Sequence, residues 1–319
     1  MDTKSILVTG GCGFIGSNIV ENLLKNGIRK VRILDNLSTG YLKNIKFLLD
    51  KYENLEFMYG SITDLETCRK AVIGMDAICH QAALGSVPRS INDPLSSHQS
   101  NVNGFFNILL AAKENNIKRV VYASSSSVYG DEEQLPKVEN KTGSVLSPYA
   151  ATKAIDEIYG WVFSHTYGME CIGLRYFNVF GPRQDPKGAY AAVIPKFIDL
   201  MRNNNQPTIN GDGNYSRDFT FVKNVIEANK LALLTENGNS FGKAFNIGAG
   251  GRVTILELFN VLKKYLKFNG EPKFGSNRDG DIPHSNASIE LAKNLLNYNP
   301  KVDFDMGIKL TVDYYLSNL

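Results

Sequence analysis

The sequence contains few of the residues that build disulfide frameworks and metal sites. Only four cysteines occur in 319 residues, they lie far apart, and none forms a C-x-x-C pair. The four histidines show no spacing typical of metal ligands. We therefore expect reduced thiols, as in a cytosolic protein, and no bound metal. The residues concerned are Cys12, Cys68, Cys79, Cys171, His80, His98, His165 and His284.

Excess charge and long apolar runs are also missing. The net charge is +3 and both signs are scattered, which argues against a nucleic-acid partner or an acidic membrane surface. No apolar run approaches the length that spans a bilayer. Residues 1–4 lead into an apolar strand without a signal-peptide pattern. These absences predict a cytoplasmic protein without a membrane partner.

Strand and helix patterns alternate through the first half of the chain. Such alternation is typical of an α/β protein with a parallel, doubly wound (Rossmann-type) sheet. After about Phe177 the regularity ends, which predicts a smaller α/β C-terminal domain. We expect strands at 5–9, 31–34, 55–59, 77–80, 120–123 and 171–175, and helices at 15–25, about 95–115 and 148 to about 167.

A glycine-rich run separates the first strand from the first helix. Residues 10–16 read G-G-C-G-F-I-G, which fits both G-x-G-x-x-G and G-x-x-G-x-x-G. Glycines let the backbone approach a pyrophosphate, and the helix N-terminus supplies N–H donors. Asp35 ends the next strand, 19 residues after Gly16, where a carboxylate accepts ribose hydroxyls and repels a 2′-phosphate. The run therefore predicts NAD rather than NADP.

A tyrosine and a lysine lie four residues apart at the expected start of the helix from residue 148. Ser147 is a good N-cap, and Pro148 suits the first helical position. Tyr149 and Lys153 share a helix face, so both can point into one cleft. A free phenol, with a pKa of about 10, is a poor base at neutral pH, but a nearby ammonium stabilises the phenolate. The pair therefore predicts a general base or acid for a sugar hydroxyl.

These motifs together resemble the extended short-chain dehydrogenase/reductase family, and within it the nucleotide-sugar 4-epimerases. The resemblance extends from Ile6 to about Ala287. Residues 80–83 (HQAA), 177–183 (FNVFGPR) and 217–219 (RDF) are similar to signatures of that group. Segments 85–90 and 188–195 most resemble the epimerases that act on UDP-N-acetylglucosamine.

The resemblance implies a catalytic set of Tyr149, Lys153 and Ser125. Tyr149 would remove the proton of the sugar 4-hydroxyl while hydride passes to NAD, and would return it after the 4-keto sugar turns over. Lys153 would favour the phenolate and hold the nicotinamide ribose. Ser125 would hydrogen-bond the reacting oxygen. The run of serines at 124–127 lacks the carboxylates that related dehydratases and decarboxylases carry there, which favours epimerisation.

The resemblance also implies a cofactor site and a division into domains. Asp64 would meet the adenine edge, Ala82 and Ala83 would lie beside the pyrophosphate and nicotinamide, and Asn101 would support them. The NAD-binding domain would comprise residues 1–177 with a return segment near 219–248. The UDP-sugar domain would comprise 178–218 and 249–319. The expected cofactor-binding residues are Gly10, Gly13, Phe14, Ile15, Gly16, Asp35, Asn36, Ile62, Asp64, Gln81, Ala82, Ala83, Asn101, Tyr149, Lys153 and Tyr176.

For the substrate, the resemblance implies an arginine clamp on the UDP diphosphate, made by Arg217 and Arg278. Ser285 stands where epimerases restricted to glucose and galactose often carry tyrosine, so it would leave space for a 2-acetamido group. UDP-GlcNAc and UDP-GalNAc are therefore the expected substrates. The expected substrate-binding residues are Ser86, Ser125, Ser126, Tyr149, Asn178, Ala192, Val193, Asn210, Arg217, Arg278, Asp281 and Ser285.

Two alternatives stay open from the sequence. The same mechanism could act on UDP-glucose and UDP-galactose, or on a UDP-hexuronic acid whose 6-carboxylate would meet Arg89. A catalytically silent nucleotide-sugar sensor would have the same fold. The family is commonly dimeric through helices such as those near 95–115 and 148–165, whose apolar residues face more than one side. A homodimer is therefore expected.

Overall fold

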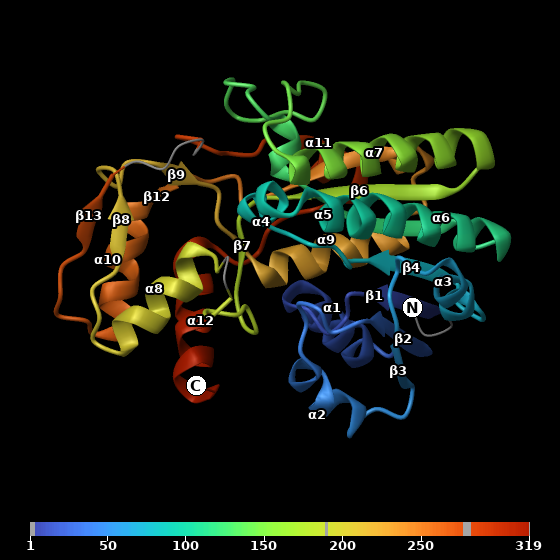
Figure 1. Ribbon diagram of the computed structural model, residues 1–319, viewed down its shortest axis with the longest axis horizontal. Coiled ribbons are helices and arrows are strands. Elements are labelled where there is room, and N and C mark those ends of the chain that lie inside the picture. The colour runs from blue at the N-terminus through green and yellow to red at the C-terminus, as the bar shows by residue number, and fades with distance from the viewer. Residues whose placement is uncertain (1–3, 189–190, 277–281, 319) are drawn as a thin grey trace.

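The structure is a computed structural model, and it describes residues 4–188, 191–276 and 282–318. Its main body is a parallel sheet of seven strands in the order β11-β6-β5-β4-β1-β2-β3 (Figure 1). This confirms the predicted Rossmann-type sheet. The strands are β1 (Ser5–Thr9), β2 (Lys30–Asp35), β3 (Leu55–Tyr59), β4 (Ala77–His80), β5 (Arg119–Ser125), β6 (Glu170–Tyr176) and β11 (Lys243–Ile247).

Helices cover both faces of this sheet, which explains why its central strands are buried along nearly their whole length. The helices α1 (Phe14–Lys25) and α9 (Val222–Leu234) pack together on one face. On the other face α6 (Gly104–Glu114) lies between α3 (Leu65–Val72) and α7 (Pro148–Tyr167). Phe105, Ile108 and Leu109 of α6 are therefore buried within one chain, whereas Phe106 and Leu110 are half-buried. Short helical segments join these elements: η1 (Leu42–Asn44), α2 (Lys46–Leu49), α4 (Val87–Asn92), η3 (Ser126–Tyr129) and η4 (Gly238–Ser240).

The expected helix at 95–115 is continuous but not regular. It consists of α5 (Pro94–His98), a π-helical turn η2 (Gln99–Asn103) and then α6. In the π-helical turn, the Asn101 side chain accepts from the amide of Leu84 and donates to Thr152. Such turns commonly mark functional sites inside helices. Periodicity alone could not indicate this one.

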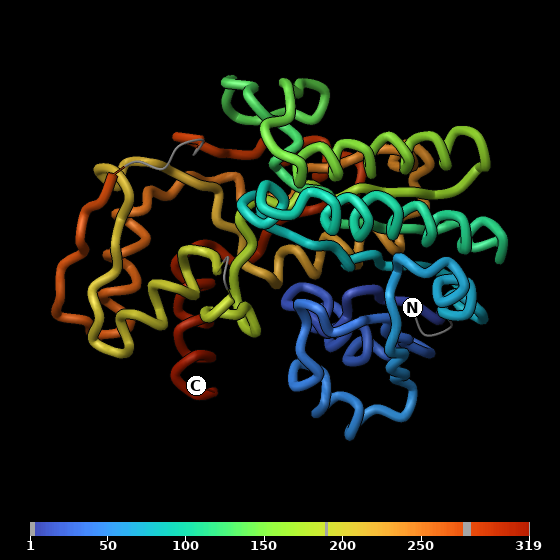
Figure 2. Tube along the Cα trace, viewed as in Figure 1, coloured from blue at the N-terminus to red at the C-terminus, as the bar shows by residue number. Residues whose placement is uncertain are grey.

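A second, smaller body follows β6 and is seen on the left in Figures 1 and 2. Its strands pair only two by two, β10 with β7, β12 with β9, and β13 with β8. The C-terminal helix α12 (Phe304–Asn318) also belongs to it. Its other elements are β7 (Val179–Phe180), α8 (Val193–Arg202), β8 (Thr208–Asn210), β9 (Ser216–Arg217), β10 (Thr220–Phe221), β12 (Val253–Thr254), α10 (Ile255–Leu266) and β13 (Lys273–Gly275). The short helix α11 (Glu290–Leu296) returns to the main body, where it contacts β11 and α9.

The strand order changes direction between β1 and β4, which are neighbours in the sheet. The chain moves outward on one side through β2 and β3, and on the other through β5, β6 and β11. The loops after β1 and β4 therefore diverge and leave a crevice at the carboxyl ends of the strands, where ligands bind in such sheets. None of the helices among the described residues has the length and apolarity needed to cross a membrane.

Candidate active site

One cavity of about 680 Å³ opens at this crevice. Its walls come from the loops after β1, β2, β3, β4 and β5, from the first turns of α7, and from the segment after β7. Many residues that are far apart in sequence therefore meet there. The predicted site residues that line it are Gly10, Gly13, Phe14, Ile15, Gly16, Asp35, Asn36, Ile62, Gln81, Ala82, Ala83, Ser125, Tyr149, Lys153 and Tyr176.

The glycine run forms a tight loop into the N-terminus of α1. Gly13 is the N-cap, and no side chain caps the helix or adds negative charge to its first turn. Gly10 has a φ of 67°, and a Cβ there would lie 2.7 Å from the Ala82 backbone nitrogen. At Gly16 a Cβ would lie 2.2 Å from the Gly10 carbonyl oxygen. The loop can therefore close only with glycine at these positions.

Asp35 connects this loop to the cavity. One carboxylate oxygen accepts from the Cys12 amide at 2.9 Å, and the other accepts from the Leu37 amide at 2.8 Å. Asp35 is only 7% exposed, yet it lines the cavity. Since a carboxylate has about four acceptor positions, it can still accept ribose hydroxyls. Asp35 thus shapes the glycine loop and faces the cavity at once.

These features fit a dinucleotide. The uncapped helix N-terminus offers amide donors and positive potential to a pyrophosphate. The absence of side chains at the glycines lets the backbone come close, and Asp35 suits a ribose diol better than a 2′-phosphate. Residues of the loops after β2 and β3 also line this cavity, so it has room for the adenosine part of a dinucleotide. The residues present therefore fit NAD.

Tyr149 and Lys153 lie in the first turns of α7, as predicted. The Ser147 side chain accepts from the Ala150 amide, Pro148 is the first helical residue, and Gly168 ends the helix with a φ of 65°. Both Tyr149 and Lys153 line the cavity. Tyr149 is half-buried, whereas Lys153 is only 2% exposed. The helix therefore holds a buried ammonium one turn from a cavity-facing phenol.

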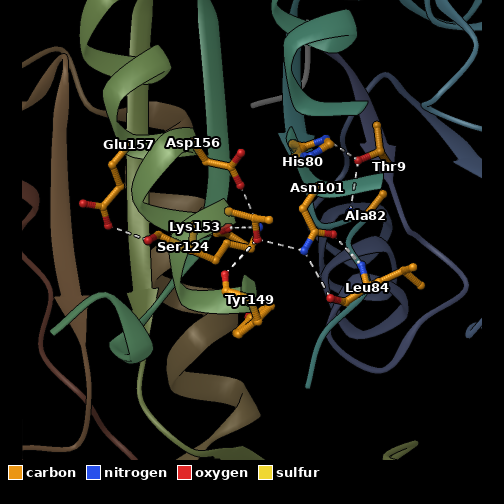
Figure 3. A network of polar contacts seen from close by, with 12 residues as sticks. Thr9, His80, Ala82, Leu84, Asn101, Ser124, Tyr149, Lys153, Asp156 and Glu157 are labelled. Carbon is orange, nitrogen blue, oxygen red and sulfur yellow. Dashed lines mark hydrogen bonds and ion pairs between the residues drawn. The ribbon is translucent and has the colours of Figure 1, made fainter. Parts of the chain in front are cut away.

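Lys153 is fixed by two acceptors. Its Nζ donates to the Ala123 carbonyl at 3.0 Å and to Asp156 Oδ2 at 2.9 Å (Figure 3). Burial works to lower the pKa of Lys153, but the negative charge of Asp156 and the nearby Tyr149 outweigh it, so this pKa is raised. Burial raises the pKa of Asp156 to about 6, although Lys153 opposes the shift. At neutral pH the two side chains therefore form an ion pair.

A second tyrosine, Tyr176, also lines the cavity but is unsuited to proton transfer. It is only 9% exposed. Its hydroxyl donates to Gln81 Oε1 and accepts from Asn229 Nδ2. Burial, with a smaller contribution from Cys79, raises its pKa. Tyr176 therefore forms part of the cavity floor, and Tyr149 is the phenol placed for chemistry.

The serine run divides into different roles. Ser124 and Ser125 both line the cavity, but the Ser124 hydroxyl is engaged, because it donates to the Glu157 carboxylate of α7 (Figure 3). Ser125 lines the cavity, and its Oγ accepts from the Ser127 amide at 3.1 Å. Ser126 begins the turn η3 and does not line the cavity. Ser125 is thus the serine placed to meet a reacting oxygen.

The loop after β4 is held by buried polar groups. Asn101, which is 1% exposed, binds both the amide and the carbonyl of Leu84. His80 Nδ1 lies 2.8 Å from Thr9 Oγ1, and Thr9 Oγ1 accepts from the Ala82 amide (Figure 3). Burial, with help from the charge of Lys153, lowers the pKa of His80 to about 3, so its ring is neutral. These contacts fix Ala82 and its neighbours against the glycine loop.

Other predicted site residues lie outside the cavity lining. The Asp64 side chain caps α3, and Ser86 caps α4 with a φ of 99°. Ser285 lies next to β9, where its amide donates to the Ser216 carbonyl at 3.0 Å. Arg278 and Asp281 fall outside the described residues. The roles of these residues, and of Asn178, Ala192, Val193, Asn210 and Arg217, stay predictions.

Sequence reasoning missed two sets of contacts at this site. Asp156 follows Lys153 by three residues, so helical spacing could have indicated their pairing. Across the cavity mouth, the Tyr41 hydroxyl donates to Asp185 at 2.7 Å, and Arg183 binds the Ser17 carbonyl and Glu21 on α1. No local pattern connects segments so far apart in sequence.

Comparison with known proteins agrees with this geometry. The model of the NAD dependent epimerase/dehydratase family matches residues 6–248. The chain belongs to this family. Within it the chain is an enzyme of the UDP-sugar 4-epimerase type, and its cofactor is NAD.

Three solved structures show the range of activities among relatives. A UDP-N-acetylglucosamine 4-epimerase from Methanobrevibacter ruminantium, in complex with UDP-N-acetylmuramic acid, is 39% identical with a TM-score of 0.94, covering 100% of both chains. A UDP-glucose 4-epimerase from Thermotoga maritima, with UDP-glucose, is 35% identical with a TM-score of 0.91, covering 98% of this chain and 99% of that one. A UDP-glucuronic acid 4-epimerase from Bacillus cereus, with UDP-glucuronic acid and NAD, is 30% identical with a TM-score of 0.90, covering 98% and 99%.

Proposed function

We propose that the enzyme interconverts UDP-N-acetylglucosamine and UDP-N-acetylgalactosamine by epimerisation at carbon 4. The observation that carries the reaction type is the convergence of Tyr149, Lys153 and Ser125 on the cavity that also contains the glycine loop. The serine run 124–127 at the end of β5 contains no carboxylate, which supports a reaction without elimination. The neighbour from M. ruminantium supports the acetylated sugar.

The proposed mechanism uses one phenol for both proton transfers. Bound NAD supplies the acceptor for the hydride from carbon 4 and later the hydride that returns to it. Tyr149 takes the proton as the O–H bond of the 4-hydroxyl breaks, and it gives the same proton back to the other epimer. The Lys153 ammonium stabilises the phenolate, and Ser125 donates a hydrogen bond to the oxygen at carbon 4. Arg217 and Arg278 would retain the nucleotide while the keto sugar turns over.

The choice of sugar rests on Ser285. This residue is half-buried in a segment tied to the strand that carries Arg217. Arg217 itself donates to the Pro283 carbonyl at 3.1 Å. The arginine proposed to bind the diphosphate is therefore attached to the segment that carries Ser285, the residue proposed to face the sugar. A serine there leaves space for the 2-acetamido group.

A panel of UDP-sugars tests the proposal. Purified enzyme without added NAD would receive UDP-GlcNAc, UDP-glucose or UDP-glucuronic acid, and NMR would follow the 4-epimer. We expect the acetylated sugar to have the highest kcat/KM. Arg89 lines the cavity, which makes the hexuronic acid a second candidate. Fastest turnover of UDP-glucuronic acid would select that candidate, and tight binding without any turnover would select a sensor.

Substitution at Ser285 should change the sugar preference. We expect Ser285→Tyr to lower kcat/KM for UDP-GlcNAc relative to UDP-glucose by about 10-fold or more, because the phenol fills the acetamido space. Ser285→Ala, which keeps the space open, is the matched control and should leave the ratio unchanged. An equal loss on both sugars in the tyrosine variant would contradict the assignment of Ser285.

We further propose that the enzyme is a homodimer through the face formed by α4, α5 and α7. These helices contact one another, and large apolar side chains stand exposed on them, including Leu95 at 64% and Trp161 at 55%. Large exposed apolar side chains on helices that pack together are typical of an interface. We expect light scattering to show a dimer, and Trp161→Glu to give a monomer. Phe274→Glu, on the equally exposed surface of β13, should stay dimeric. A monomeric wild-type enzyme would refute the proposal.

A further inference from the structure

We propose that Asp156 is the buried counter-ion of Lys153 and thereby sets the upper end of the pH range in which the Tyr149–Lys153 pair works. This inference rests on the proposed roles of Tyr149 and Lys153. It concerns a positioning residue, because Asp156 does not line the cavity and acts only through the lysine. Tyr149, Lys153 and Asp156 follow one another along one face of α7 at helical spacing (Figure 3).

The contact is direct and almost completely shielded from solvent. Asp156 Oδ2 lies 2.9 Å from Lys153 Nζ, and the two side chains are 1% and 2% exposed. The other carboxylate oxygen of Asp156 finds no hydrogen-bond partner among the described residues. The lysine is therefore the main reason for this carboxylate to be charged.

Fold stability does not explain such a pair. Removing two charges from water is costly, and well-packed apolar residues at such positions are often as stable or more stable. The order of the residues, with the cation N-terminal to the anion, is also the weaker one for a helix. A buried pair that includes the catalytic ammonium therefore indicates a role in controlling its charge.

Other ionisable groups around the pair do not take over this role. The charge of Glu157, the next residue on α7, also favours the Lys153 ammonium, but its carboxylate is paired with Nε and Nη2 of Arg175 from β6. His80 on β4 is neutral because its pKa is lowered to about 3. Tyr122 on β5 is neutral because burial raises its pKa. Among the described residues, Asp156 is the carboxylate that contacts Lys153.

The electrostatic consequence has a definite sign. The negative charge of Asp156 favours the protonated, charged form of Lys153, so its removal favours the neutral amine. The alkaline limb of the activity profile reports loss of the Lys153 ammonium. Without Asp156, the alkaline limb should therefore move toward lower pH.

The test is the pH profile of kcat/KM for Asp156→Asn in the holoenzyme, with whichever UDP-sugar the wild type converts. We expect the alkaline limb to move to lower pH by about one unit or more. Asp156→Glu keeps the charge and should leave the alkaline limb near its wild-type position. Glu290→Gln, which removes the anion of the exposed Glu290–Lys293 pair, is the matched control and should not move the profile. A lower rate with an unmoved alkaline limb, or a shift of that limb to higher pH, would overturn the proposal.

A second measurement does not depend on turnover. The melting temperatures of Asp156→Asn, Lys153→Met and the double variant report whether Asp156 and Lys153 interact, because interacting residues give non-additive changes in stability. We expect the double variant to unfold at a higher temperature than Lys153→Met, because it leaves no lone buried carboxylate. Additive losses would refute the pairing even if the single variants fold poorly. If the wild type converts no UDP-sugar, the proposed function fails, and this cycle still decides the pairing.

Discussion

Tyr149→Phe should reduce epimerisation by a factor on the order of 10² to 10⁴, the contribution of a positioned acid or base. The substitution removes only the hydroxyl that exchanges the proton with the sugar. The ring is half-buried at the start of α7, and the contacts that hold this helix turn come from the backbone of Tyr149 and from Ser147. The variant should therefore keep its fold, its bound NAD and its affinity for UDP.

Single-turnover kinetics with UDP-GlcNAc and calorimetric titration with UDP would measure the two properties separately. Tyr59→Phe is a suitable control, because Tyr59 is 70% exposed at the end of β3. It should retain wild-type turnover. Full activity of the Tyr149→Phe variant would show that another group transfers the proton, and loss of NAD would show that the hydroxyl is structural.

Gly16→Ala should abolish NAD retention and destabilise the protein. The added Cβ would lie 2.2 Å from the Gly10 carbonyl oxygen and 2.9 Å from the Gly11 Cα, and both are backbone atoms that cannot rotate away. The glycine loop must therefore shift, at a cost of about 1–3 kcal/mol. Since this loop is placed to meet the pyrophosphate, the shift also weakens cofactor binding.

The measurement is the amount of NAD released from the denatured, purified protein, together with its melting temperature. Gly238→Ala provides the control, because a Cβ at Gly238 would meet nothing within 4 Å. The control should carry as much NAD as the wild type. A Gly16→Ala variant with a full complement of NAD and an unchanged melting temperature would mean that the loop does not contact the cofactor.

The strands, the glycine loop and the start of α7 could be predicted because local rules determine them. Buried β-branched runs indicate parallel strands, and Ser147, Pro148 and Gly168 mark the ends of α7. Features that depend on distant contacts could not be predicted in this way. In the π-helical turn, the Asn101 side chain meets Leu84 and Thr152, which lie 17 and 51 residues away in the sequence.

The substrate side of the site depended on resemblance for a physical reason. Strands as short as β8 and β13 have no alternation of apolar and polar residues that would indicate them in the sequence. Their positions relative to the main sheet are determined by contacts between distant parts of the chain. Arg217 and Ser285 are brought together by the pairing of residue 216 with residue 284. No helical or strand spacing connects these two positions.

Asp35 both lines the cofactor cavity and accepts hydrogen bonds from two backbone amides, and this limits how the coenzyme preference of this enzyme could be redesigned. Replacing the carboxylate to admit a phosphorylated ribose would also remove the acceptors of the Cys12 and Leu37 amides. Two buried or half-buried donors would lose their partners in the same step. A switch of coenzyme would therefore require the turn itself to be rebuilt around new acceptors, and a single exchange of charge at this strand end would not suffice.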